Sequence, residues 1–74
     1  MPYKISASGR GMFKPFASWD LTKLQQKALE YAWNNDPDWF GAVDVAKEYG
    51  YPNGQYFRGV LASLHKKGLL IKGD

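Results

Sequence analysis

The sequence has no cysteine and no run of apolar residues long enough to cross a bilayer. Without cysteine, neither a disulfide bond nor a thiolate metal site can hold the fold together. A membrane-spanning helix needs about 20 consecutive, predominantly apolar residues, and the first residues also lack the apolar block of a signal peptide. We therefore expect a cytoplasmic protein of 74 residues that is stabilised by packing alone.

The usual signatures of catalysis are also missing. The sequence contains no glycine-rich phosphate loop, no spacing typical of metal ligands and no catalytic pattern of Ser, His and Asp. The one histidine, His65, has no cysteine or acidic cluster beside it, so we expect it on a helix surface. A chain this short leaves little room for a substrate pocket. We expect no catalytic residue, metal site, cofactor, small-molecule substrate or membrane partner, and therefore no enzyme.

Positive charge is concentrated at the two ends of the chain. Residues 1–18 carry three basic and no acidic side chains, and residues 53–74 carry four basic side chains against one acidic. The middle, residues 19–52, carries three basic side chains against six acidic ones. This distribution is typical of a one-sided surface that binds an anion such as nucleic acid, and ordinary surface charge explains it equally well.

Hydrophobic spacing and turn signals divide the chain into an arm and a helical domain. Residues 1–19 contain Gly, Ser, Lys and aromatic residues and are expected to form a basic arm, with the domain over residues 20–74. Thr22 and Gln25 have the form of a capping box, which predicts that the first helix begins after Thr22. Segment 34–38 is rich in Asn, Asp and Pro, which predicts that this helix ends there.

Two further helices follow in quick succession. The second is expected over about residues 42–49 and should end at Gly50, a residue suited to the left-handed position after a helix. Asn53 is a good N-cap for the third helix, over about residues 54–67, and Gly68 should stop that helix. One apolar stripe along the third helix is expected in the core, formed by Phe57, Val60, Leu61 and Leu64.

Extended segments are few and short. Residues 69–72 read as a strand, and residues 3–7 alternate weakly between apolar and polar. Residues 39–41 are too short for a strand of their own but can add one or two ladder bonds.

The order of these elements resembles a winged helix-turn-helix domain. The resemblance covers about residues 20–72 and is carried by segments 21–29, 43–51 and 57–70, the last of which looks like the recognition helix of MarR-like and related prokaryotic and phage regulators. It implies a mainly α fold with three helices and a β-wing. The usual wing is a two-stranded hairpin, whereas only one strand follows the third helix here. Either the wing is reduced, or the N-terminal segment pairs with residues 69–71.

The resemblance also implies a function and a set of contact residues. In such domains the first turns of the third helix enter the major groove of double-stranded DNA. The residues that correspond to base contacts are Gln55, Tyr56, Arg58 and Gly59. The residues expected to contact the DNA backbone are Asn53, Ser63, Lys66, Lys67, Lys72, Lys4, Arg10 and Lys14.

Other interpretations of these residues stay open at this point. Pairing with an acid such as Glu48 is the alternative role for Arg58, and packing under the arm is the alternative for Tyr56. A glycine inside a helix, as at Gly59, costs roughly 1 kcal/mol relative to alanine, which close approach of a partner or neutral drift would each explain. The leading hypothesis is a small transcriptional regulator or phage accessory protein on the nucleoid, acting as a homodimer or with a larger partner. The alternatives are a winged-helix module that binds only proteins, or binding of single-stranded nucleic acid through the arm.

Overall fold

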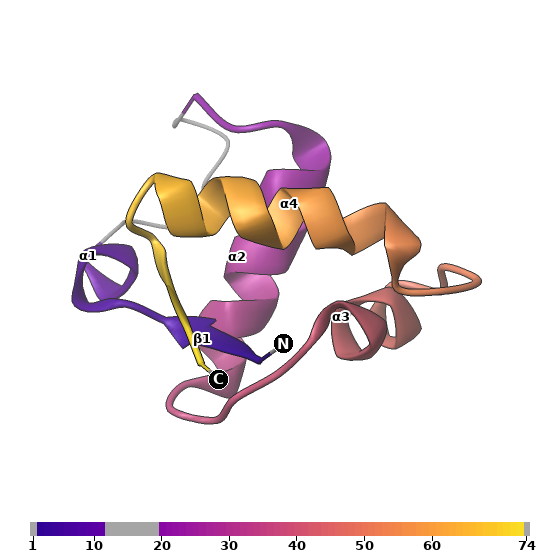
Figure 1. Ribbon diagram of the computed structural model, residues 1–74, viewed down its shortest axis with the longest axis horizontal. Helices are drawn as coiled ribbons and strands as arrows, with labels where there is room; N and C mark the ends of the chain where they lie inside the picture. Colours follow the sequence, from indigo (N-terminus) through magenta and orange to yellow (C-terminus); the bar gives the residue numbers. More distant parts are fainter. Residues whose placement is uncertain (1, 12–19, 74) are drawn as a thin grey trace.

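The computed structural model describes residues 2–11 and 20–73, which form a small, mainly helical domain with a two-stranded antiparallel sheet (Figure 1). The mainly α prediction is confirmed. Lys14 and the expected boundary between arm and domain lie outside the described residues. Along the chain the elements are β1 (Tyr3–Ile5), α1 (Ala7–Arg10), α2 (Lys23–Asn35), α3 (Ala42–Glu48), α4 (Gln55–Lys66) and β2 (Leu70–Lys72).

The predicted capping box begins α2. The Thr22 hydroxyl accepts a hydrogen bond from the Gln25 amide at 3.2 Å, and the Gln25 side-chain oxygen accepts one from the Thr22 amide at 2.9 Å. The helix ends at Asn35, with Asp36 as its C-cap, inside the segment predicted to end it. The Asp36 side chain forms an ion pair with Arg10, from the end of α1.

Replacing Thr22 with alanine is expected to lower the free energy of unfolding by about 1 kcal/mol, because one amide of the first turn loses its acceptor. Urea denaturation followed by circular dichroism measures the change. Thr22→Ser keeps the hydroxyl and should stay close to the original protein. Equal losses in the two variants would contradict the capping role.

The other two longer helices, α3 and α4, meet at a tight turn. Gly50 follows α3 with φ of 75° and Gly68 follows α4 with φ of 80°, which confirms both predicted stops. The N-cap of α4 is Gly54, one residue after the predicted Asn53. The Asn53 side chain still accepts a hydrogen bond from the Gln55 amide at 2.9 Å, so it caps one amide of the first turn. A Cβ on Gly54 would lie 2.9 Å from the Val43 amide nitrogen. The turn therefore needs glycine here, because α3 and α4 come too close for a side chain.

The sheet joins the two ends of the chain. β1 pairs with β2 in the antiparallel register that places Tyr3 opposite Lys72 and Ile5 opposite Leu70. Tyr3 also exchanges two backbone hydrogen bonds with Phe40, at 2.7 and 2.8 Å. The pairing of the N-terminal segment with the strand after the third long helix is thus confirmed, and so are the ladder bonds expected near residue 40.

A short helix that the sequence did not predict follows β1. The Ser6 hydroxyl accepts a hydrogen bond from the Gly9 amide at 3.0 Å, which caps α1, and donates one to the Gly68 carbonyl at 2.6 Å. β1 consequently ends at Ile5, short of the expected Ala7. With only four residues, α1 is too short to show a hydrophobic period.

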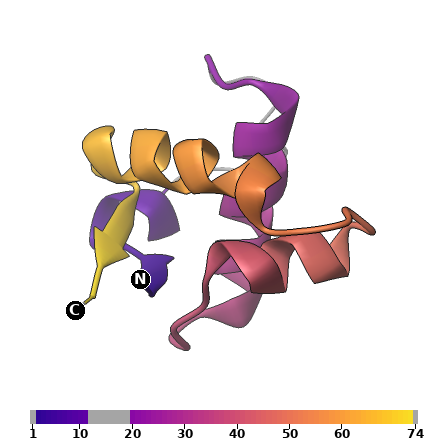
Figure 2. The same ribbon diagram turned by 45° about the vertical axis from the view of Figure 1, so that its right-hand side comes forward.

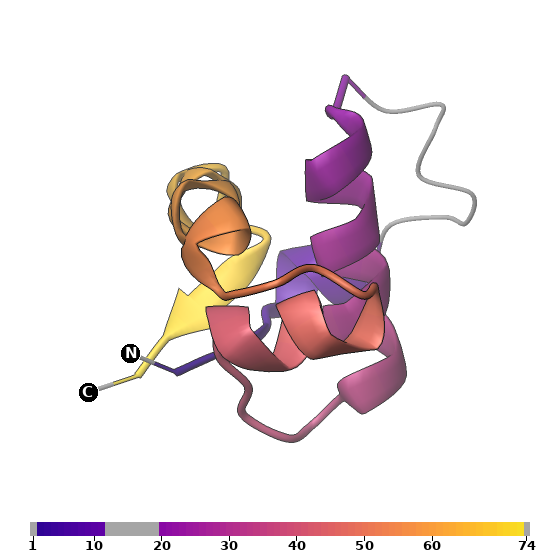
Figure 3. The same cartoon turned by 90° about the vertical axis from the view of Figure 1, so that its right-hand side faces the viewer.

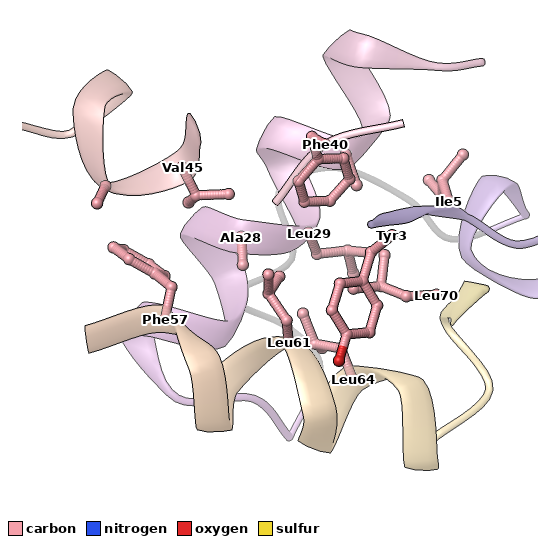
Figure 4. Close-up of a cluster of buried hydrophobic side chains, with 12 residues drawn as sticks. Tyr3, Ile5, Ala28, Leu29, Phe40, Val45, Phe57, Leu61, Leu64 and Leu70 are labelled. Carbon is pink, nitrogen blue, oxygen red and sulfur yellow. The ribbon is translucent and has the colours of Figure 1, made fainter. Parts of the chain in front are cut away.

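The core lies between the sheet and the three longer helices (Figure 4). Three residues of the predicted apolar stripe of α4, Phe57, Leu61 and Leu64, are fully buried in the core. The fourth, Val60, is only partly buried and packs against the edge of the core. The buried apolar cluster consists of Tyr3, Ile5, Ala28, Leu29, Ala32, Phe40, Val45, Ala46, Phe57, Leu61, Leu64 and Leu70. With that stripe turned inward, the opposite face of α4 lies on the outside of the molecule.

Candidate nucleic-acid interface

α4 crosses α2 and presents one side to solvent, as the end-on view of the helix shows (Figure 3). Residues three and four apart lie on the same face of a helix, and one such line is exposed along the whole of α4. This outer strip consists of Gln55, Gly59, Ala62 and Lys66. Its two polar residues flank two small ones, so the helix backbone is most accessible in the middle of the strip.

The fold does not require the glycine in this strip. No atom of the described residues lies within 4 Å of the position that a Cβ on Gly59 would take, once its own helix backbone is set aside. Its φ is also outside the left-handed region that favours glycine. Internal packing therefore does not account for Gly59, which leaves close approach of a partner and neutral drift as the explanations for it.

One flank of α4 faces the sheet. Arg58 and His65 are seven residues apart and so lie on the same side of the helix. The His65 Nδ1 atom is 3.1 Å from the Leu70 carbonyl oxygen, and its ring meets the Tyr3 ring in an edge contact with centroids 6.3 Å apart. His65 is exposed on the helix surface, as predicted.

The other flank faces α2. Tyr56 is 51% exposed and its ring packs against Tyr51, with centroids 5.3 Å apart. The Ser63 hydroxyl donates to the Val60 carbonyl and accepts from the Gln25 side-chain amide, both at 2.8 Å. Ser63 is thus tied to the interior, while Tyr56 is free to meet a partner at the side of the outer strip.

A hollow of about 830 Å³ lies on the sheet-facing flank, between the start of α3 and the first turns of α4. No acidic residue belongs to its lining, which consists of Tyr3, Gly41, Ala42, Val43, Asn53, Gly54, Gln55, Arg58 and Leu61. The predicted residues Asn53, Gln55 and Arg58 are therefore brought together at one site.

Tyr3 lines this hollow. Its ring is buried, and its hydroxyl has no internal hydrogen-bond partner in the described part of the chain. Its side chain points from β1 toward α4, with the hydroxyl oxygen at the α4 end (Figure 4), and the residue is only 8% exposed. The hydroxyl forms no hydrogen bond within residues 2–11 and 20–73. Every fully buried side-chain polar atom among those residues does have a partner, so the Tyr3 hydroxyl keeps some contact with solvent.

The cations of α4 are not neutralised internally. Among the described residues the ion pair between Arg10 and Asp36 is the only one, so the alternative pairing of Arg58 with Glu48 does not form. Arg58, Lys66 and Lys67 are all exposed, and Lys72 lies nearby on β2. Their charges are available to an anionic partner.

Two of the predicted backbone contacts are engaged elsewhere. The Lys4 ammonium lies 4.7 Å from the centre of the Trp39 ring, and Lys4 leaves β1 on the face opposite Tyr3 because side chains alternate along a strand. Arg10 binds Asp36 through two hydrogen bonds, of 2.9 and 3.0 Å. This hydrogen bonding and the charge of Asp36 raise the pKa of the Arg10 guanidinium.

Three acidic residues of the middle of the chain lie near two tyrosines, Tyr31 on α2 and Tyr49 just after α3. Burial, followed by the negative charges of Asp44 and Glu48, raises the pKa of Tyr31. Burial, followed by the charges of Glu30 and Glu48, raises the pKa of Tyr49. Glu30, Asp44 and Glu48 therefore lie near Tyr31 and Tyr49, away from the cations at the end of α4.

Tyr3, Val43 and Leu61 were not predicted as part of any site. They come from three different elements, β1, α3 and α4, and complete the walls of the hollow only because those elements pack together. Nothing in their local sequence distinguishes them from core residues. The unpaired hydroxyl of Tyr3 becomes visible only once the ring has been placed.

Comparisons with known proteins found no match to a protein-family model, a curated protein or a solved structure. In the part of the chain that the structure describes, no helix is both long enough and apolar enough to cross a membrane. Residues 2–11 and 20–73 also contain no group of three or more His, Asp or Glu side chains placed to hold a metal ion. A functional conclusion therefore rests on the geometry of α4 and of the hollow beside it.

Proposed function

We propose that this chain is a small winged helix-turn-helix domain that binds double-stranded DNA, with the outer strip of α4 in the major groove. The order α2, α3, tight turn, α4 and β2 supports the fold assignment, with α4 as the third helix of that architecture. The wing needs a second strand beside β2, and β1 occupies that position although it comes from the other end of the chain. The tip of the wing corresponds to the meeting of Pro2 and Gly73, whose backbones are joined by a hydrogen bond of 2.8 Å.

The exposed outer strip of α4 is the observation that carries this proposal. Figure 2 shows α4 at the outside of the molecule, with the sheet and α3 below it. The major groove, about 12 Å wide, admits an α-helix. Gly59 and Ala62 allow the helix backbone to approach the base edges, and an amide such as that of Gln55 can form paired hydrogen bonds with adenine. Tyr56 lies beside the strip, where its half-exposed ring can meet a thymine methyl or its hydroxyl a phosphate.

The exposed cations at the end of α4 serve the DNA backbone in this proposal. Lys66 and Lys67 lie at the end of α4, and cations there neutralise phosphates without reading sequence. One copy of the domain offers few phosphate contacts, so useful affinity calls for a second copy or a larger protein partner. In this role the protein is a binding protein on the nucleoid, a small transcriptional regulator or phage accessory protein, rather than an enzyme.

The proposal is tested by fluorescence anisotropy with a duplex library at two salt concentrations. The original protein should retain duplex at the lower salt and lose affinity steeply at the higher one, because counterions are released on binding. Lys66→Ala should lower the slope of log affinity against log salt by about one. Lys4→Ala removes the same charge from the opposite face of the sheet and should leave the slope unchanged.

Failure to retain any duplex at the lower salt would refute the proposal, as would equal effects of the two lysine variants. Two results would favour the other hypotheses. Tighter binding of single-stranded oligonucleotides, with quenching of tryptophan fluorescence, would indicate a single-strand binder. Absence of all nucleic-acid binding would favour a protein-interaction module.

A further inference from the structure

We infer that the hollow beside α4 is a phosphate-binding site, formed by the Arg58 guanidinium and the Tyr3 hydroxyl. This inference rests on the proposed function, under which the phosphate belongs to the backbone of the bound DNA strand. It assigns Arg58 to the DNA backbone rather than to a base, and it adds Tyr3, from the other end of the chain, to the binding surface.

Tyr3 is held as a preorganised donor. Its ring is buried between the sheet and α4, in edge contact with His65. Its backbone is fixed by two hydrogen bonds to Phe40, at 2.7 and 2.8 Å. A phenol hydroxyl donates readily to a phosphate oxygen. Tyr3 lines the hollow, and its ring cannot move without disturbing the core. The proposed site therefore uses the free hydroxyl in a fixed position, so little entropy is lost when it binds.

Arg58 supplies the charge on the same lining. Its side chain is exposed and has no ion pair among the described residues. A guanidinium group matches the geometry of a phosphate through two parallel hydrogen bonds. No carboxylate belongs to the lining of the hollow, so no neighbouring acid there competes with a bound anion.

The position of Arg58 on α4 explains why it should meet a phosphate and not a base. Arg58 lies on the flank of the helix that faces the sheet, to the side of the outer strip. When the outer strip points at the floor of a groove, the flanks of the helix face the groove walls, which are the sugar-phosphate strands. The register adds a further cation on that side, because Lys72 lies opposite Tyr3 and cross-strand partners share a face.

The decisive variants are Tyr3→Phe, which removes one hydroxyl and keeps the ring, and Arg58→Ala. Tyr3→Phe should weaken duplex binding roughly tenfold without changing the salt slope, because the lost group is uncharged. Arg58→Ala should lower the slope by about one and weaken binding equally for all sequences. Tyr31→Phe removes a hydroxyl that lies near Asp44 and Glu48, away from the hollow, and serves as the matched control, with unchanged affinity expected. Thermal unfolding of each variant checks that the fold is retained.

The inference is overturned if folded Tyr3→Phe binds duplex like the original protein. It is also overturned if Arg58→Ala relaxes the preference at one base position and leaves the salt slope unchanged. A titration with inorganic phosphate, followed by amide chemical shifts, separates this site from the proposed function. Shifts at the hollow that weaken in Tyr3→Phe would support the phosphate site even if the original protein retained no duplex, and in that case only the DNA proposal would fail.

Discussion

Gly59→Gln is expected to weaken duplex binding by roughly a hundredfold or more while the protein stays folded. A glutamine at this position fills the space in the middle of the outer strip and holds the helix away from the base edges. Displacement of the helix removes at least two base contacts of about 1–3 kcal/mol each, and every 1.4 kcal/mol corresponds to about a tenfold change. Fluorescence anisotropy at constant salt measures the loss.

The folded state should tolerate this change well. No atom of the described residues occupies the space beside Gly59, and glutamine forms helices better than glycine by up to about 1 kcal/mol. Gly59→Ala is the matched control, since it should raise the free energy of unfolding by about 1 kcal/mol and add only one methyl group to the strip. If Gly59→Gln binds duplex as tightly as Gly59→Ala, the outer strip is not the DNA-binding surface.

Gly9→Ala is expected to destabilise the protein by about 1–3 kcal/mol or more, because a side chain at this position has no room. A Cβ on Gly9 would lie 2.5 Å from the Leu69 carbonyl oxygen and 2.7 Å from Cγ1 of Ile5. The Leu69 carbonyl cannot simply move away, since it accepts a hydrogen bond of 3.0 Å from the Ser6 amide. Urea denaturation measures the loss, which is large relative to the total stability of a small domain.

Gly11→Ala provides the control for this prediction, two residues further along the chain. A Cβ on Gly11 would meet its nearest neighbour among the described residues, the Ser8 carbonyl oxygen, at an ordinary distance of 3.6 Å. Its stability should therefore change little. Similar stabilities for the two variants would show that α1 does not need its close approach to the segment before β2.

The local signals in the sequence were sufficient for the three long helices. The capping box at Thr22, the apolar stripe of α4 and the two glycine stops all depend on residues within a few positions of one another. Such signals act through hydrogen bonds and side-chain spacing inside one element, so they can be read along the chain. The end of α2 was also predicted, because the Asn, Asp and Pro residues of segment 34–38 are local signals that stop a helix.

The candidate site was only partly predictable, because part of it depends on contacts between segments that are distant in sequence. The exposed residues of α4 follow from its helical period, once the apolar stripe is assigned to the core. The helical period alone does not tell which flank of α4 faces the sheet. It therefore could not show that Arg58 lies on that flank while Gln55 lies on the outer strip. Tyr3 carried no local signal, because its importance comes from its position opposite α4 in the folded state.

By itself, then, the sequence determined the three longer helices, the capping box of α2, the two glycine stops and the surface of α4 that lies outside its apolar stripe. Only the tertiary structure decided between a reduced sheet and a sheet completed by the N-terminal strand, and only it placed Tyr3 and Arg58 on one hollow. The physical reason is the range of the interactions involved. Helix signals are local, whereas strand pairing and the hollow depend on contacts between residues at opposite ends of the chain.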